Sequence, residues 1–282
     1  MSGLAITGAT GAIGGAVAAN VAAAGAAMTL VVRDPSRAPS YPGAEVRRAG
    51  SYGDTEAMRA AFDGVTTVFL VSATESADRV AQHRSAVDAA VAAGVGRIVY
   101  LSFLAAAPEA TFTFARDHFH TEEYIKASGL AHTFLRPSLY ADYVPGMVWD
   151  DGAIRGPAGS GRIAWVARAD VADSASSVLM TDGHDGRTYD LTGPRTLTMV
   201  ETAEVLAAAT GRGVHYIPET LDEARASRGS YGAAEWEVEG WITSYAAIAT
   251  GEMDVVSEAV ATLTGRPATP LREAVEQAQG AS

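Results

Sequence analysis

A glycine-rich turn near the N-terminus has the residue types and spacing of a dinucleotide-binding motif. It runs Gly-Ala-Thr-Gly-Ala-Ile-Gly from Gly8 to Gly14, after the apolar run 3–7 and before the alanine-rich stretch 16–24. This order predicts a strand, a tight turn and a helix. In such a turn, glycines let backbone N–H groups approach a pyrophosphate at the positive end of the helix. A glycine turn without a ligand is the alternative, but the surrounding elements favour dinucleotide binding.

The end of the second predicted strand, 28–32, carries Arg33 where the kind of dinucleotide is selected. A carboxylate there holds the ribose 2′-hydroxyl of NAD, whereas an arginine accommodates the 2′-phosphate of NADP. The guanidinium of Arg33, with Arg37 close enough to assist, suits a phosphate. We therefore expect NADPH rather than NADH. If Asp34 faces the ribose instead, NADH would be used as well, and Arg33 would be a solvated turn residue.

The residues available for acid-base chemistry differ from those of ordinary short-chain dehydrogenases. Those enzymes activate a carbonyl with a Tyr-x-x-x-Lys pair, in which the lysine lowers the phenol pKa. The single lysine here, Lys126, has Glu122 four residues before it, so the pair is absent. His118 falls on the helix predicted at 116–128, where a side chain can reach the C-terminal edge of the sheet. We take His118 and Tyr140 as candidate catalytic residues, with a surface histidine as the alternative for His118.

The composition excludes several other classes of site. The 282 residues contain no cysteine, which excludes disulfides and thiolate chemistry. The histidines lack His-Glu-x-x-His spacing and no Gly-x-Ser-x-Gly elbow occurs, so we expect no metal site and no serine hydrolase. A formal net charge of −12 disfavours a nucleic-acid partner. With no bilayer-length apolar run and no signal-peptide pattern, we expect a cytoplasmic protein that has no membrane partner.

Strands and helices alternate through the first half of the chain. Because parallel neighbours need crossover connections, this alternation predicts an α/β fold with a Rossmann-type doubly wound parallel sheet. Beyond the elements already named, strands are expected at 45–49, 65–71, 97–101 and 132–136, and helices at 54–62 and 76–93.

The pattern changes after Pro137, where a segment rich in glycine and proline begins a region of shorter elements. Helices are expected at 170–180 and 199–210, with a strand at 188–191 between them. We assign residues 1–138 to an NADP-binding Rossmann domain, to which a segment near 163–192 returns. The remaining part of 139–282 is expected to form a smaller, mainly helical substrate-binding lobe.

Aromatic residues gather in the segments expected around the nicotinamide end of the cofactor. An apolar, aromatic pocket suits a flat hydride acceptor, although packing between the two lobes accounts for many such residues. The residues are Phe103, Phe112, Phe114, Phe119, Tyr140, Tyr143 and Trp149.

Several short motifs together resemble the NmrA-like atypical short-chain dehydrogenases. Within that family the chain looks most like the type 2 NAD(P)H:quinone oxidoreductases, from Leu4 to about Glu276. The motifs are Ile6-Thr7-Gly8-Ala9-Thr10-Gly11, Val32-Arg33-Asp34-Pro35, Ser51-Tyr52-Gly53-Asp54, Gln82-His83-Arg84, and Thr121-Glu122 followed by Ser128-Gly129-Leu130.

The resemblance implies that NADPH is the hydride donor and that the glycine turn wraps its pyrophosphate. It also implies that Arg33 takes the 2′-phosphate, that Ser51 and Tyr52 flank the adenine, and that Val71 and Ser72 line the ribose path. The expected cofactor-binding residues are Gly8, Thr10, Gly11, Ala12, Ile13, Gly14, Arg33, Arg37, Ser51, Tyr52, Val71, Ser72, Ser102 and Phe103.

Two functions of different classes stay open. The first is an oxidoreductase that transfers a hydride from NADPH to a quinone or a similar conjugated or polycyclic aromatic acceptor. One form of this hypothesis places the enzyme in a biosynthetic pathway. Such an acceptor needs little acid assistance, which is consistent with the missing Tyr-Lys pair. The second is a non-catalytic NADP(H) redox sensor that binds a regulatory protein, because the family includes such members. A homodimer is compatible with either function.

Overall fold

The computed structural model describes residues 3–280, and its main sheet has seven strands in the order β3-β2-β1-β4-β5-β6-β9. The pairs from β3 through β6 run parallel, in the order of a doubly wound nucleotide-binding sheet. The predicted α/β fold with a Rossmann-type sheet is confirmed. The strands are β1 (Leu4–Thr7), β2 (Met28–Val32), β3 (Ala44–Arg48), β4 (Thr67–Val71), β5 (Arg97–Leu101), β6 (Ala131–Pro137) and β9 (Arg187–Leu191).

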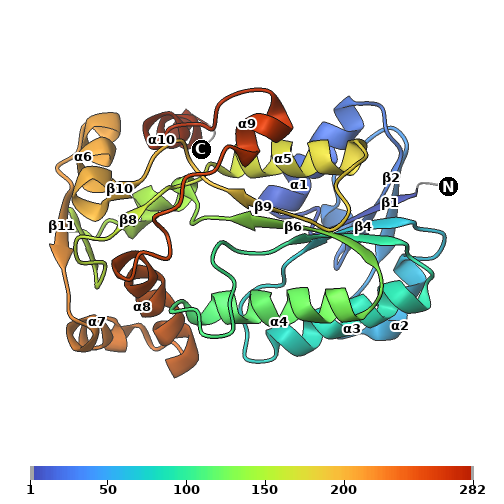
Figure 1. The fold of residues 1–282 in the computed structure, drawn as a ribbon, viewed down its shortest axis with the longest axis horizontal. Helices are drawn as coiled ribbons and strands as arrows, with labels where there is room; N and C mark the ends of the chain where they lie inside the picture. The colour runs from blue at the N-terminus through green and yellow to red at the C-terminus, as the bar shows by residue number, and fades with distance from the viewer. Residues whose placement is uncertain (1–2, 281–282) are drawn as a thin grey trace. The chain divides into compact units, whose positions relative to one another are not determined.

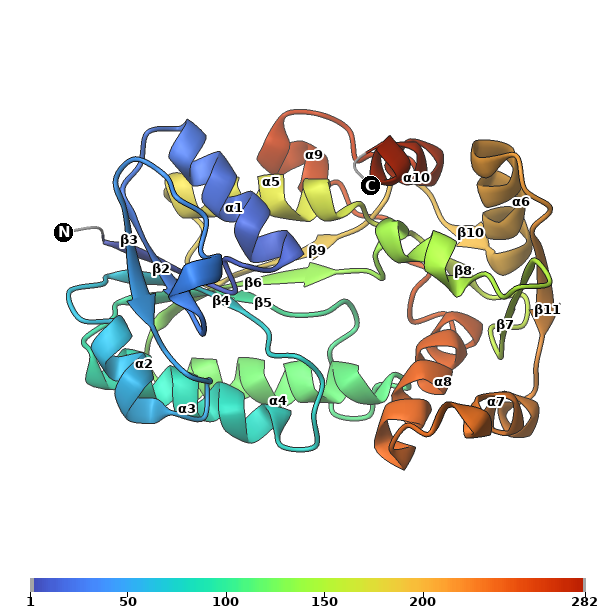
Figure 2. The same cartoon turned by 180° about the vertical axis from the view of Figure 1, so that it is seen from behind.

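Helices cover both faces of this sheet, which explains why its inner strands are continuous apolar runs. All five residues of β2 are buried, whereas the edge strand β3 exposes charged side chains. Figures 1 and 2 both show α1 and α5 on one face and α2, α3 and α4 on the other. These helices are α1 (Ala12–Ala23), α2 (Thr55–Ala61), α3 (Arg79–Ala92), α4 (Thr113–Ala127) and α5 (Arg168–Met180).

The chain divides into two compact units. The first comprises residues up to 102 together with 117–136 and 171–189, and it contains most of the sheet. One of its buried clusters joins α2, α3 and α4 to the sheet through Phe62, Leu70 and Tyr100. This cluster buries the side of β5 on which polar residues of α3 and α4 also meet.

The second unit comprises 103–116, 137–170 and the chain from 190 onward. Its core contains Trp165, Leu206 and Ile248, and its strands form two small sheets, β7 with β11 and β8 with β10. Its remaining elements are η2 (Ala141–Met147), β7 (Ala153–Gly156), β8 (Arg162–Ile163), β10 (Leu197–Thr198), α6 (Met199–Thr210), β11 (His215–Pro218), α7 (Leu221–Arg228), η3 (Gly229–Tyr231), α8 (Glu235–Ala249), α9 (Ala259–Thr264) and α10 (Leu271–Gly280).

Helix boundaries depart from the sequence prediction where tertiary contacts extend or shorten an element. The helix predicted at 116–128 begins at Thr113, whose backbone N–H donates to Thr243 Oγ1 at 3.2 Å. Helix α2 begins at Thr55, one residue after its predicted start, because the Asp54 side chain caps it by accepting a hydrogen bond from the Ala57 N–H. Among the described helices, none has the length and apolar character needed to span a bilayer.

Candidate cofactor and active site

The glycine turn after β1 leaves no room for side chains at its centre. Gly8 has a φ of 63°, and the Gly11 N–H donates to the Gly8 carbonyl at 2.8 Å. A Cβ placed on Gly14 would lie 2.4 Å from the Gly8 oxygen. Helix α1 then begins at Ala12, with Gly11 as its N-cap and Ile13 buried. The turn therefore brings the backbone of the predicted pyrophosphate-binding residues together at a helix N-terminus, as the motif requires.

Hydroxyl groups tie the carboxyl ends of β1 and β4 together beside this turn. The Tyr52 hydroxyl lies 2.6 Å from both Thr7 Oγ1 and the Val71 carbonyl oxygen. The Val71 N–H donates to the same Thr7 oxygen at 2.9 Å, and burial raises the pKa of Tyr52. Ser51 is exposed and Ser72 is half-buried. The hydroxyl of Tyr52 therefore acts inside the fold, and a contact of its ring with an adenine stays a prediction.

Arg33 and Asp34, between which the sequence left the cofactor preference open, have different surroundings. The Asp34 carboxylate accepts hydrogen bonds from the Ser36 backbone N–H and hydroxyl, at 3.0 and 2.7 Å, and caps the short helix η1 (Pro35–Arg37). These bonds lower the pKa of Asp34. Within residues 3–280 the exposed Arg33 guanidinium makes no hydrogen bond or ion pair, and Arg37 is exposed beside it.

A chain of buried hydrogen bonds runs from the segment after β4 to His118. The Ala73 N–H donates to His83 Nε2 at 2.8 Å. His83 Nδ1 lies 2.9 Å from Thr121 Oγ1 and 3.4 Å from the Tyr100 hydroxyl, which lies 2.9 Å from His118 Nδ1. Because His118 is 4% exposed, the alternative of a surface histidine is wrong.

The buried cation Arg79 completes this cluster. Its Nε donates to the Ala73 carbonyl at 2.9 Å, so both backbone polar groups of Ala73 are held, and its Nη1 lies 3.9 Å from Asp117 Oδ2. Burial, with Arg79 close by, lowers the pKa of His83 to about 3 and that of His118 well below its usual value. Burial likewise raises the pKa of Asp117. Both histidine rings are therefore neutral near pH 7.

Ser102, at the end of β5, is linked to the buried carboxylate of Glu122. Its hydroxyl donates to Glu122 Oε1 at 2.5 Å, and Arg136 of β6 binds both carboxylate oxygens, at 2.8 and 2.5 Å. Glu122 is 0% exposed, so this ion pair joins β5, α4 and β6 within the first unit. A contact of Ser102 with the cofactor stays a prediction.

The aromatic residues predicted near the nicotinamide divide between the two units. In the second unit Phe103 packs edge-on against Phe112, with ring centres 5.0 Å apart. Phe114 continues this row to Trp236, which the sequence analysis did not single out. Further ring contacts join Tyr140 to Tyr143 and Trp149 to Tyr231 in the second unit, and Phe119 to His120 in the first.

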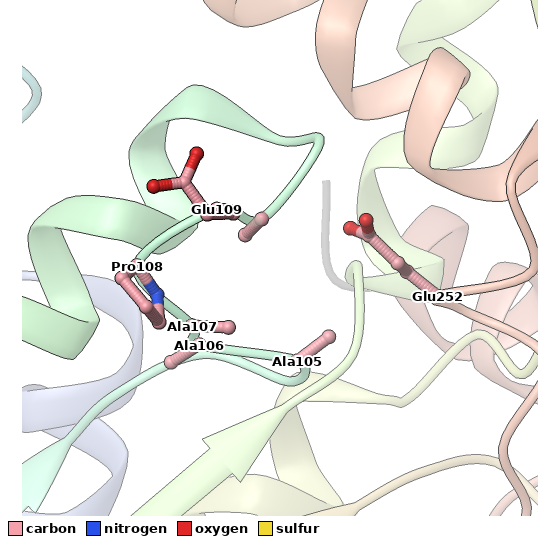
Figure 3. Close-up of a pocket in the computed structure, with 7 residues that line it drawn as sticks. Ala105, Ala106, Ala107, Pro108, Glu109 and Glu252 are labelled. Atoms are coloured by element: carbon pink, nitrogen blue, oxygen red, sulfur yellow. The ribbon is translucent and has the colours of Figure 1, made fainter.

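A shallow pocket of about 340 Å³ lies in the second unit along the loop that follows Phe103. Figure 3 shows it between residues 105–110 and the side chain of Glu252. Glu252 holds this loop by accepting hydrogen bonds from the Thr111 N–H and hydroxyl, the latter at 2.6 Å. Ala105 adopts a φ of 56°, a left-handed conformation that is uncommon for alanine. The loop is therefore fixed by a carboxylate distant in sequence.

Comparison with known proteins identifies the family. Residues 8–182 match the family model described as NAD(P)H-binding. The chain belongs to the NAD(P)H-binding family. The matched region begins within the glycine turn and includes Arg33 and His118.

Two relatives and one solved structure match almost the whole length of this NAD(P)H-binding protein. Quinone oxidoreductase 2 of Escherichia coli is 34% identical over 281 residues, covering 96% of this chain and 97% of that protein. The (4-alkanoyl-5-oxo-2,5-dihydrofuran-3-yl)methyl phosphate reductase of Streptomyces griseus is 35% identical over 277 residues, covering 95% of each. The crystal structure of the E. coli NADPH-dependent quinone oxidoreductase complexed with NADPH has a TM-score of 0.88 and 32% identity, covering 97% of this chain and 99% of that one.

These similarities confirm the NmrA-like resemblance and the expectation of an NAD(P)H-dependent oxidoreductase of this family. The sequence analysis missed the cluster around His83, Tyr100 and Arg79. Two of the quoted motifs contain His83 and Thr121, but a motif does not report which side chains meet across α3, α4 and β5.

Proposed function

We propose that this protein uses NADPH to reduce a quinone or a similarly conjugated carbonyl compound. The observation that carries the proposal is the exposed Arg33, at the end of β2 beside the glycine turn, with no partner inside the described chain. The E. coli relative, named a quinone oxidoreductase and matching over almost the whole chain, supports the acceptor class.

The residues present fit a bound dinucleotide. The close approach of Gly14 to the Gly8 carbonyl keeps the turn free of side chains, so the backbone N–H groups of Thr10, Ala12 and Ile13 are the expected pyrophosphate donors, since that of Gly11 is bound to Gly8. Arg33, assisted by Arg37, would hold the 2′-phosphate, since Asp34 is engaged with Ser36. The expected contacts with the adenine, ribose and nicotinamide parts are made by Ser51, Tyr52, Val71, Ser72, Ser102 and Phe103.

When bound, NADPH would supply the hydride, and the protein would supply orientation and a proton. A quinone reduced in this way yields a stabilised phenolate, so its reduction demands little acid assistance. The proposed roles of His118 and Tyr140 are to donate hydrogen bonds or protons to the developing oxygen anion. We assign the cofactor to residues 1–138 with the returning segment near 163–192, and the acceptor to the rest of 139–282.

A second acceptor class is an α,β-unsaturated carbonyl compound of a biosynthetic pathway. The 35% identity to the S. griseus furanone phosphate reductase favours it. The two acceptor classes share a conjugated carbonyl group, and one enzyme assay separates them. The cytoplasm, the absence of nucleic-acid partners and a homodimer stay predictions.

The test combines turnover with cofactor binding. NADPH oxidation is followed by the absorbance of the reduced nicotinamide with a panel of quinones and enones, beside binding titrations of NADPH and NADH. Arg33→Ala should weaken NADPH binding by about 10- to 100-fold, the loss expected for charge-assisted hydrogen bonds, and should leave NADH binding nearly unchanged. Arg212→Ala, which removes an exposed arginine of the second unit, is the matched control.

Each outcome has a distinct meaning. Turnover with tighter NADPH binding supports the proposal, and the preferred acceptor separates the quinone class from the enone class. Tight NADPH binding without turnover on any acceptor points to the redox sensor instead. Equal loss of NADPH and NADH binding in Arg33→Ala would contradict the role given to Arg33.

A further inference from the structure

We infer that Tyr100 and His83 are positioning residues that place the ring proton of His118 on Nε2. The inference comes from the direction of the buried hydrogen-bond chain that begins at the Ala73 backbone. Its use in catalysis rests on the proposed function, whereas the position of the proton does not.

The chain of hydrogen bonds has a fixed donor-to-acceptor direction because it starts at a backbone N–H. The Ala73 N–H can only donate, so His83 Nε2, 2.8 Å away, must carry the lone pair. A neutral imidazole has one N–H, which places the proton of His83 on Nδ1. Nδ1–H then donates to Thr121 Oγ1 at 2.9 Å, because the Thr121 hydroxyl proton is directed to the Asp117 carbonyl at 2.8 Å.

The next step passes through the Tyr100 hydroxyl. It cannot donate to His83 Nδ1, 3.4 Å away, because that nitrogen already bears a proton. The Thr121 oxygen is a further polar neighbour, but among the described residues its hydrogen bonds run to His83 and the Asp117 carbonyl and not to Tyr100. His118 Nδ1, at 2.9 Å, is therefore the acceptor of the Tyr100 proton. If Nδ1 of His118 carries the lone pair, its ring proton is on Nε2.

Burial and surrounding charges keep this arrangement neutral. Tyr100 and His83 are 0% exposed and His118 is 4% exposed. The cations Arg79 and Arg136 oppose protonation of His118, after burial itself. The carboxylates near the chain are engaged elsewhere: Glu122 binds Ser102 and Arg136, and Asp117 faces Arg79.

The consequence is that His118 offers an N–H at Nε2 and is not arranged as a base at that nitrogen. A neutral imidazole N–H is a hydrogen-bond donor for an oxygen on which negative charge develops. Tyr100 and His83 would act through His118 rather than on the substrate. The same His83 ring also holds Ala73, two residues beyond the end of β4, so one side chain serves both the segment after β4 and His118.

The experiment observes the ring protons directly. Two-bond ¹H–¹⁵N spectra of the ¹⁵N-labelled full-length protein near pH 7 distinguish the two neutral tautomers and the protonated ring. We expect His83 as the Nδ1–H form and His118 as the Nε2–H form, with signals assigned by their loss in His83→Gln and His118→Gln. Wild-type His118 in the Nδ1–H form, or protonated, would overturn the inference.

Tyr100→Phe supplies the decisive comparison because it removes only the hydroxyl. We expect the His118 signals to change to a tautomer mixture while His83 keeps its Nδ1–H form. Tyr124→Phe removes a hydroxyl that donates to the exposed carboxylate of Asp88, and it should leave the tautomers of both histidine rings unchanged. An unchanged His118 in folded Tyr100→Phe would contradict the role of Tyr100.

Activity separates this inference from the proposed function. We expect Tyr100→Phe to lower kcat by about tenfold, less than the roughly 10²- to 10³-fold found when a positioned donor is itself removed, with an unchanged Kd for NADPH. An unaltered kcat would contradict the catalytic use of the tautomer. If no acceptor is reduced by wild type but the tautomers are as stated, the proposed function fails and the assignment of Tyr100 and His83 stands.

Discussion

At the scale of single residues, the proposed cofactor site depends on shape in the glycine turn and on charge at Arg33. Gly14 acts by having no side chain, and Arg33 by presenting an unpaired cation at the end of β2. Asp34 lies next to Arg33 in sequence, yet its carboxylate is turned to Ser36. Substitutions in the turn should therefore weaken the binding of NADPH and NADH equally. Substitution of Arg33 should weaken the binding of NADPH alone.

Gly14→Ala tests the shape of the turn. Its Cβ would lie 2.4 Å from the Gly8 oxygen, so the backbone must shift away from the arrangement that binds pyrophosphate. We expect at least a tenfold weaker binding of both NADPH and NADH, measured by titration of nicotinamide fluorescence. Gly229→Ala, where a Cβ meets open space at a φ of −59°, is the control. Unchanged affinity in Gly14→Ala would argue against dinucleotide binding at this turn.

At the scale of elements, α4 is joined to the sheet by polar groups as well as by apolar packing. Glu122 connects it to β5 through Ser102 and to β6 through Arg136, and His118 connects it to β5 through Tyr100. These bonds set the rotation of α4 about its axis. The position of His118 on α4 therefore depends on polar contacts with β5 and β6.

Glu122→Gln tests the buried ion pair. The amide keeps the size of the side chain but removes the buried negative charge that faces Arg136, so we expect a loss of about 3–5 kcal/mol in the free energy of unfolding. Urea denaturation followed by circular dichroism measures it. Lys126→Ala, which breaks an exposed pair with Glu123 on the same helix, should change stability by less than about 1 kcal/mol. Similar losses of unfolding free energy in both variants would contradict a larger contribution of the buried Glu122–Arg136 pair to stability.

At the scale of the whole molecule, the two units differ in where their histidines and tryptophans lie. Five of the six histidines, at positions 83, 118, 120, 132 and 184, belong to the first unit. The four tryptophans, at positions 149, 165, 236 and 241, all belong to the second. Tryptophan fluorescence therefore reports on the second unit, and acid sensitivity of the buried histidines belongs to the first.

The free energy of unfolding should fall as the pH is lowered through the range in which His83 is protonated in the unfolded chain but neutral in the folded protein. In the unfolded chain the His83 ring takes up a proton near pH 6.5, whereas folding lowers the pKa of His83 to about 3. Stability from this ring is therefore fully present above pH 6.5 and is lost as the pH falls toward about 3. At pH 5 the loss is about 2 kcal/mol for this one histidine.

Urea denaturation at several pH values, followed by circular dichroism, measures this dependence. His83→Gln cannot take up the proton, so its stability should fall less steeply between pH 6.5 and 5 than that of wild type, even though it starts from a lower value. Equal slopes in the two proteins would show that His83 is not neutral in the folded state.

Much of the nucleotide-binding half was predictable because its signals are local. The order of strand, glycine turn and helix from Leu4 to Ala23 depends on residue size and backbone freedom within a few residues. Alternating apolar runs likewise predicted β4, β5 and β6, because strands covered on both faces are apolar throughout. Helix α4 was placed one turn late, since its start depends on Thr243, far away in the sequence.

The sequence by itself determined the fold class and the dinucleotide-binding character, because both follow from short-range patterns of glycine and apolar residues. Only the tertiary structure decided that Glu122 is buried with Arg136 and that His83, Tyr100 and His118 form one chain. The physical reason is that hydrogen-bond direction and burial are properties of groups brought together from separate elements. A histidine in a sequence therefore has no defined tautomer until its neighbours in space are known.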